Sequence, residues 1–206
     1  IGQAIQTKDK SIIQKRALEQ VKAGADALDV NCGPASKDPL NDIQWLINSI
    51  QEVTDRAIAI DSSRPQVIES GLKAAKNKVI INSTTADQDK LDALIPLALK
   101  YNAKLIGLTI SKKGIPQNKD QRLELAATIV AACQEKGFPI EDIYLDPIVM
   151  PVNVAQSQMK GGSSLLSLEL DADDLDTTKR FVNGLQYFAL GVSWGGFESL
   201  SVPYVV

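Results

Sequence analysis

Between residues 11 and 150, amphipathic helical segments alternate with short runs rich in β-branched residues. Each helical segment is followed within a few residues by a strand-like run that ends in a polar side chain. This alternation is typical of βα units around a parallel sheet. It predicts five helices over 11–25, 39–55, 64–77, 87–102 and 118–137, and five strands over 26–31, 57–61, 79–83, 103–110 and 142–149.

The first predicted helix carries start and stop signals. Ser11 is expected at its N-cap, and Gly24 lies at its close. Because parallel crossovers are right-handed, all the helices should lie on one side of the sheet. The other face must then be covered by curling into a barrel, by a partner, or by further strands.

After Pro151 the regular alternation of helical and strand patterns ends. Residues 152–164 are polar and contain glycine, as a linker would. A strand pattern over 165–170, a helical pattern over 171–188 and a second strand pattern over 189–194 follow. The tail is therefore predicted to be one β-α-β unit, which brings the strand count to seven, one short of an eight-stranded barrel.

Composition narrows the classes of function. The chain has 206 residues and a net charge of -3, without a basic segment, so nucleic acid and anionic membranes are not expected as partners. It contains no apolar run long enough for a membrane span. Cys32 and Cys133 stand far apart, which fits a reducing, cytoplasmic location. The absence of His removes the commonest general base and metal ligand.

Polar side chains gather where the predicted strands end, namely Asn31, Asp61, Asn82 and Asp146. The carboxyl ends of barrel strands are where such folds build ligand sites. Carboxylates and carboxamides without a neighbouring cation suit a neutral heterocycle rich in N–H donors. The alternative is that these residues only cap turns and helices. The pattern alone leaves both interpretations open.

Five motifs carry a resemblance to a known family: "DALDVNCGPASKDP", "AIDSSRPQVIESGL", "VIINSTT", "LIGLTISKKGIP" and "DIYLDPIVMPVNVAQ". In this order they resemble the pterin-binding barrel of methyltetrahydrofolate:corrinoid methyltransferases, over residues 3–157. The resemblance implies that Asp61, Asn82 and Asp146 hydrogen-bond the pterin. It also implies that Asn31 lies at the same end of the barrel, where the strands finish. It also implies a further first strand and two later ones, so that five of eight barrel strands are matched.

The final segment, "GGSSLLSLELDADDLDTTKRFVNGLQYFALGVSWGGFESL", resembles the C-terminal domain of the cystathionine β-lyase and γ-synthase family of pyridoxal-phosphate enzymes, over residues 161–200. The resemblance implies that Ser193 and Trp194 help to hold a substrate carboxylate. The lysine motif for the cofactor is not matched, and Lys160 lies in no such motif. Pyridoxal phosphate is therefore not expected, and Ser193 and Trp194 are interpreted as a strand end and a packing anchor.

Three other features favour ordinary structural roles. Cys32 lacks an adjacent activating partner and is interpreted as a packed thiol. Lys112 and Lys113 could bind an anion, but such a run is usually a solvated loop. Trp45 falls on the apolar face of its helix and is expected in the core.

The sequence thus predicts an α/β chain, with a parallel βα repeat derived from a partial TIM barrel of five strands and a C-terminal β-α-β unit. The expected segments are 1–157 and 158–206, packed as one globular unit, with an open sheet or an incompletely closed barrel. The preferred interpretation is an engineered or recombined chimera without catalytic activity, holding no cofactor. The alternatives are residual binding of a pterin or folate such as methyltetrahydrofolate, or a methyltransferase seen in part that acts with a corrinoid protein. A homodimer through an exposed sheet edge is an alternative to closure.

Overall fold

The computed structural model describes residues 1–33, 36–148, 189–190 and 200–201. The chain divides into two compact units, Ile1–Ile148 and Val149–Val206. The first unit contains every helix and five of the seven strands described, and the second contributes two short strands. In the described part of the chain, no helix is both long and apolar enough to cross a bilayer.

The first unit is built on a five-stranded parallel sheet in the order β1-β2-β3-β4-β5. Each strand is hydrogen-bonded to the strand that follows it in the chain, as consecutive βα units require. Among the described residues β1 and β5 are the edges, so the sheet is open. The strands are β1 (Ala27–Val30), β2 (Ala57–Asp61), β3 (Val79–Thr85), β4 (Lys104–Leu108) and β5 (Ile143–Asp146). The predicted parallel, incompletely closed α/β fold is confirmed, whereas the homodimer through a sheet edge stays a prediction.

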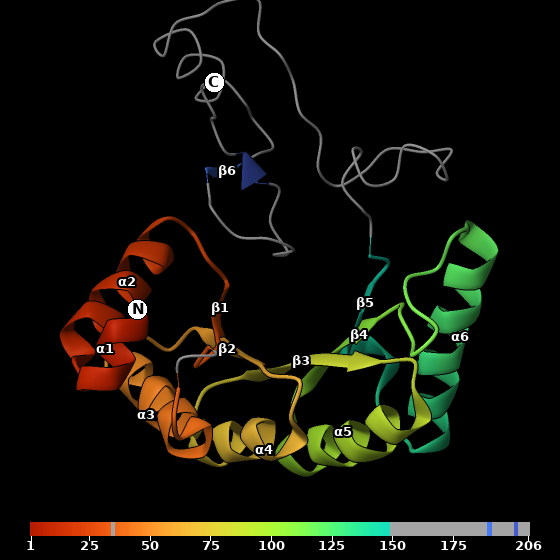
Figure 1. Ribbon diagram of the computed structural model, residues 1–206, viewed down its shortest axis with the longest axis horizontal. Helices are drawn as coiled ribbons and strands as arrows, with labels where there is room; N and C mark the ends of the chain where they lie inside the picture. Colours follow the sequence, from red (N-terminus) through yellow and green to blue (C-terminus); the bar gives the residue numbers. More distant parts are fainter. Residues whose placement is uncertain (34–35, 149–188, 191–199, 202–206) are drawn as a thin grey trace, which may run out of the picture. The chain divides into compact units, whose positions relative to one another are not determined.

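Helices precede and connect these strands, and Figure 1 shows them in an arc along one side of the sheet. The five predicted helices are confirmed, although most end a few residues earlier than expected. A separate first helix was not predicted. The helices are α1 (Gly2–Thr7), α2 (Lys10–Lys22), α3 (Pro39–Gln51), α4 (Pro65–Ala74), α5 (Gln88–Tyr101) and α6 (Lys119–Glu135), and a 3-10 turn, η1 (Ile140–Asp142), leads into β5.

The start of α2 differs from the prediction. Its N-cap is Asp9 rather than Ser11, because the Asp9 carboxylate accepts hydrogen bonds from the Ser11 amide at 3.0 Å and from the Ser11 hydroxyl. These hydrogen bonds hold the pKa of Asp9 below its usual value. A carboxylate at this position satisfies one free amide and complements the helix dipole, so the helix begins at Lys10.

The two faces of the sheet have different side chains. In β2, Ile58 and Ile60 point to the helices and are fully buried, whereas Ala57, Ala59 and Asp61 alternate with them on the other face. The main core lies between the sheet and the helices. It includes Ile43, Ile47, Ile58, Ile60, Ile68, Ile81, Leu91, Leu94, Ile95, Leu105 and Ile129, all fully buried. On the inner face, the described residues form a small hydrophobic cluster around Ala59, Ile80 and Ile106.

In the second unit, β6 (Ala189–Leu190) pairs in parallel with β7 (Leu200–Ser201). The strand predicted over 189–194 is thus confirmed at its first two residues, and β7 was not predicted. The strand expected over 165–170, the helix over 171–188 and the boundary at residue 157 lie outside the described residues. The same holds for Lys160, Ser193 and Trp194.

Candidate functional site

Three of the four predicted site residues meet at the carboxyl end of the sheet. Asp61, the last residue of β2, stands opposite Asn82 of β3 in the parallel register. Asn31 directly follows β1, and its Nδ2 donates to Oδ2 of Asp61 at 2.8 Å. Because register partners in a parallel sheet point to the same face, the three side chains share the inner face of the sheet. The predicted convergence of Asn31, Asp61 and Asn82 is therefore seen in the structure.

A second hydrogen bond, to the side-chain oxygen, fixes the orientation of the Asn31 carboxamide. The Gly33 amide donates to Asn31 Oδ1 at 2.6 Å. This is the local turn that an Asn side chain forms with the backbone two residues on. Gly33 itself has a φ of 68°, in the left-handed region that glycine adopts readily. The turn after β1 therefore directs the nitrogen of Asn31 to the carboxylate of Asp61.

Asp29 is a fourth member of this cluster that the sequence prediction missed. It lies in the middle of β1, and its Oδ1 accepts a hydrogen bond from Asn82 Nδ2 at 3.1 Å. The sequence does hold a signal: Asp29 stands between buried Leu28 and Val30, so it must point to the inner face. An acidic residue at an inward position of such a strand is itself the signal of a site candidate.

The environment of Asp29 disfavours its charged form. Loss of hydration against the sheet raises the pKa of Asp29 above its usual value, the hydrogen bond from Asn82 opposes this, and the charge of Asp61 adds to the rise. The side chain nevertheless keeps an exposed surface on the open inner face, which limits the effect. Two carboxylates therefore share this edge of the sheet, separated by carboxamides that satisfy one oxygen of each.

Asp146 occupies the same face but a different neighbourhood. It pairs in register with Leu108, one row beyond the row of Asn82, which pairs with Ile106. A bulge between Asn82 and Thr84 shifts the register of β3 against β4. Oδ1 of Asp146 accepts from the amide of Ile148 at 2.8 Å, so this carboxylate organises its own turn. No hydrogen bond joins it to the other cluster residues in the described part of the chain.

The remaining sequence candidates have structural roles. Cys32 is buried, with its Sγ 3.9 Å from the carbonyl oxygen of Pro39, which agrees with a packed thiol. Exposed Lys112 forms an ion pair with Asp89 at 3.0 Å, and Lys113 is exposed in the same loop. Trp45 packs partly buried against the core, as expected. Within the described ranges, no group of three or more acidic or Cys side chains could hold a metal ion.

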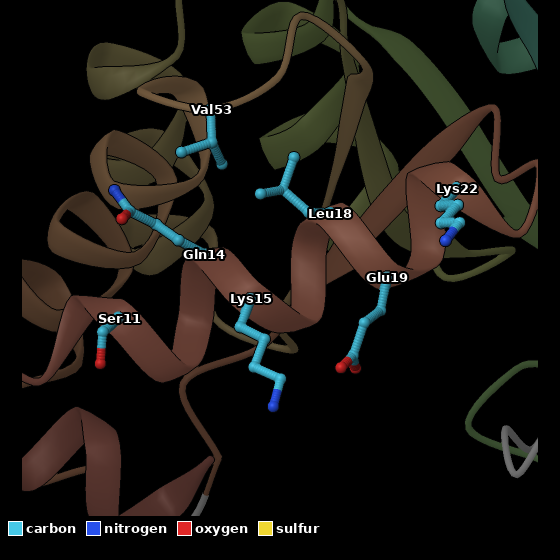
Figure 2. Close-up of a pocket in the computed structure, with 7 residues that line it drawn as sticks. All are labelled: Ser11, Gln14, Lys15, Leu18, Glu19, Lys22 and Val53. Carbon is cyan, nitrogen blue, oxygen red and sulfur yellow. The ribbon is translucent and has the colours of Figure 1, made fainter.

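A shallow depression of about 480 Å³ lies along α2 and not at the strand ends. Figure 2 shows Gln14 and Leu18 pointing toward Val53, whereas Lys15 and Glu19 extend away from it. Gln14 is already engaged, because its Nε2 donates to the Ser49 carbonyl at 3.1 Å. None of the residues that line this depression belongs to the Asp29, Asn31, Asp61 and Asn82 cluster.

Comparison with known protein families identifies the family of the chain. Residues 3–174 match the model of the family described as pterin binding enzyme. The chain belongs to the pterin-binding enzyme family. The match continues beyond residue 157, where the sequence prediction placed the end of the pterin-binding segment. It ends at residue 174, inside the segment that was predicted to resemble pyridoxal-phosphate enzymes.

Two individual proteins are similar to parts of the chain. The chain is 28% identical over 155 residues to a methylcorrinoid:tetrahydrofolate methyltransferase of Eubacterium limosum, and the match covers 74% of this chain and 57% of that protein. The crystal structure of 7,8-dihydropteroate synthase from Vibrio fischeri ES114 superposes with a TM-score of 0.53 and 22% identity, over 68% of this chain and 57% of that one. The chain thus spans 57% of the length of each.

These findings favour the pterin-binding alternative over the interpretation of an inactive fold chimera. The resemblance of residues 161–200 to cystathionine β-lyase gains no support from them and stays a prediction. The likeness to the synthase shows the fold alone. The family and the fold are therefore established, and the ligand and the reaction belong to the proposal that follows.

Proposed function

We propose that the chain binds the pterin ring of methyltetrahydrofolate at the carboxyl end of its sheet. Asp61, Asn82 and Asp146 would hydrogen-bond the ring, and Asn31 would hold Asp61 in place. The observation that carries the proposal is the pairing of Asp61 with Asn82 in neighbouring strands, with Asn31 bonded to Asp61 at 2.8 Å. This pairing sits in a chain of the pterin-binding enzyme family.

The chemistry of the ligand supports this assignment. A pterin carries a ring N–H beside an exocyclic amino group, and a carboxylate can accept from both. Asp61 has one oxygen engaged by Asn31, so its other oxygen is left for the ligand among the described residues. Asp146 likewise has Oδ1 on the Ile148 amide and Oδ2 for a ligand. A charge-assisted hydrogen bond of this kind is worth roughly 1.5–3 kcal/mol.

The reaction we propose is methyl transfer between methyltetrahydrofolate and a corrinoid protein. It is supported by the similarity to the methyltransferase of Eubacterium limosum over three quarters of this chain. In this reaction a methyl group would be exchanged between N5 of the folate and the corrinoid, and N5 would take up a proton from solvent when it loses the methyl group. The described residues would hold the pterin ring while the corrinoid protein presents its cobalt.

Calorimetric titration with methyltetrahydrofolate tests the binding step. The wild-type chain should bind, and Asp61→Asn and Asn82→Ala should each weaken the affinity by about tenfold or more. Asp146→Ala tests separately whether Asp146 contributes to binding of the ring. Asp55→Asn is the matched control, because Asp55 is an exposed carboxylate just before β2, at the opposite end of the strand. A wild-type chain that takes up no methyltetrahydrofolate would refute the proposal.

The transfer step is tested with methyltetrahydrofolate labelled at the methyl group. The chain is incubated with reduced free cobalamin, and the label recovered on the corrinoid is measured. Transfer that exceeds the rate without protein, and that falls with Asp61→Asn, supports a methyltransferase. Binding without transfer would instead leave the chain as a pterin binder.

A further inference from the structure

The two ends of the Asn82 carboxamide are chemically different, and the structure fixes which end faces β1. Nδ2 of Asn82 donates to Oδ1 of Asp29 at 3.1 Å. A carboxylate can only accept, so the nitrogen and not the oxygen must face Asp29. The oxygen of Asn82 is therefore the end available to a ligand.

The second carboxamide of the cluster is fixed by the same logic. The Gly33 amide can only donate, so it requires the oxygen of Asn31, and the Asn31 nitrogen is left for Asp61. Each of the two carboxamides thus donates an N–H group to a carboxylate of the sheet. What remains toward the ligand from Asp61 and Asn82 is oxygen.

We propose that Asp29 is a positioning residue, which holds the Asn82 carboxamide with its oxygen toward the ligand and so makes the site select rings with neighbouring N–H donors. The inference rests on the proposed function, because it assumes that Asn82 touches the pterin. Asp29 itself lies one row deeper in β1, beside Ala59, and acts through Asn82. It is one of the two carboxylates in the cluster, and the other is Asp61.

A pair of ligands that differ at one position tests the selectivity. Pterin carries an amino donor at C2 and a donor at N3, whereas lumazine has a carbonyl acceptor in place of the amino group. The wild-type chain should prefer pterin. In Asp29→Asn, residue 29 can donate or accept, so Asn82 can turn over and meet the lumazine carbonyl with its nitrogen. The preference for pterin, measured as the ratio of the two dissociation constants, should fall about tenfold or more.

The ratio of the two dissociation constants shows whether Asp29 positions Asn82 or only stabilises the fold. If Asp29 only stabilised the sheet, Asp29→Asn would weaken the binding of both ligands together and leave the ratio unchanged. That result would overturn the inference. Asp55→Asn should leave both dissociation constants at the wild-type values, and circular dichroism with thermal unfolding checks that each variant is folded.

A measurement without ligand distinguishes failure of the proposed function from failure of the inference about Asp29. The side-chain amide signal of Asn82 is identified in ¹⁵N spectra as the signal that Asn82→Ala removes. It should move in Asp29→Asn and stay in place in Asp55→Asn. A moved signal in a chain that binds neither pterin nor lumazine would overturn the proposed function while the Asp29 contact stands. A signal indifferent to Asp29→Asn, in a chain that does bind pterin, would overturn this inference alone.

Discussion

Asn82 of β3 hydrogen-bonds Asp29 of β1 across the full width of the strand between them, at 3.1 Å. Adjacent strands lie about 4.8 Å apart, so the two backbones are separated by roughly twice that distance. The residue below this bridge is Ala59 of β2, which pairs in register with Asp29 on one side and Ile80 on the other. Its single methyl group leaves room for the two side chains to meet.

Replacing Ala59 by valine should break this bridge. The two added methyl groups would occupy the space over β2, while a β-branched residue still suits the strand. We expect pterin affinity to fall about tenfold and the preference over lumazine to be lost, as in Asp29→Asn. Calorimetry with both ligands measures this. Ala57→Val is the matched control, because Ala57 lies on the same face one row deeper, beside Ala27. Wild-type affinity in Ala59→Val would show that pterin binding does not need the bridge.

A second prediction concerns Asn31, which should act on the ligand through Asp61. In Asn31→Ala, Asp61 loses the donor at 2.8 Å and the Gly33 amide loses its acceptor. Because the cluster is partly open to solvent, we expect a loss of about 1 kcal/mol in pterin binding, smaller than in Asp61→Asn. Calorimetry should give affinities in the order wild type, Asn31→Ala, Asp61→Asn. Asn48→Ala removes an exposed carboxamide from α3 and serves as the control. The reverse order would make Asn31 a direct ligand.

The sequence predicted the five strands well because their pattern is local. In β2, isoleucine on the helix side and alanine on the inner side alternate along five residues, and Asp61 marks the end. The same pattern placed Asn31, Asp61 and Asn82 at one edge, since the ends of consecutive parallel strands must be neighbours. Family resemblance and physical pattern agreed on these residues.

The partners of the site residues could not be predicted in the same way. Asp29 and Asn82 are 53 residues apart, and only the register of β1, β2 and β3 brings them together. Within its own strand, Asp29 is one polar residue between two apolar ones. For Asp146, the alternative that the strand-end residues only cap turns holds in part, because its carboxylate accepts a hydrogen bond from the Ile148 amide two residues on. Both interpretations of that residue were open from the sequence.

A third prediction concerns pH and the buried carboxylate of Asp42, at the start of α3. Burial favours its protonated form, but hydrogen bonds from Lys8 and Ser36 outweigh this and hold the pKa of Asp42 below its usual value. A lowered pKa in the folded state means that the stabilisation is present above the ordinary Asp pKa and is lost as the pH falls through the folded value. The chain should therefore lose stability on acidification below about pH 4.

The comparison that isolates this effect is Asp42→Asn. Its urea midpoint should lie below that of the wild type at pH 7, and the difference should shrink as the pH falls toward 3. Asp55→Asn controls for the loss of one exposed carboxylate. A difference between wild type and Asp42→Asn that stays constant over this range would mean that the ion pair with Lys8 does not contribute.

The last prediction concerns the contact of α6 with the sheet at Gly107 of β4. A Cβ atom at this position would lie 2.9 Å from Cγ2 and 3.2 Å from Cδ1 of Ile129, which is fully buried in α6. Gly107→Ala must therefore push the helix away or strain the isoleucine, at a cost of roughly 1–3 kcal/mol in the free energy of unfolding. Urea denaturation measures it. Gly2→Ala, where an added Cβ meets nothing within 4 Å, should be close to neutral.

A double-mutant cycle tells whether Ile129 is the cause. Ile129→Ala removes both methyl groups that crowd the new Cβ, at the price of a cavity in the core. If the contact explains the loss, Gly107→Ala should cost clearly less free energy in the Ile129→Ala background than in the wild type, since residues in contact are not additive. Equal costs in both backgrounds would place the strain elsewhere, with Leu145 as the next candidate, because its Cδ2 would be 3.4 Å from the added atom.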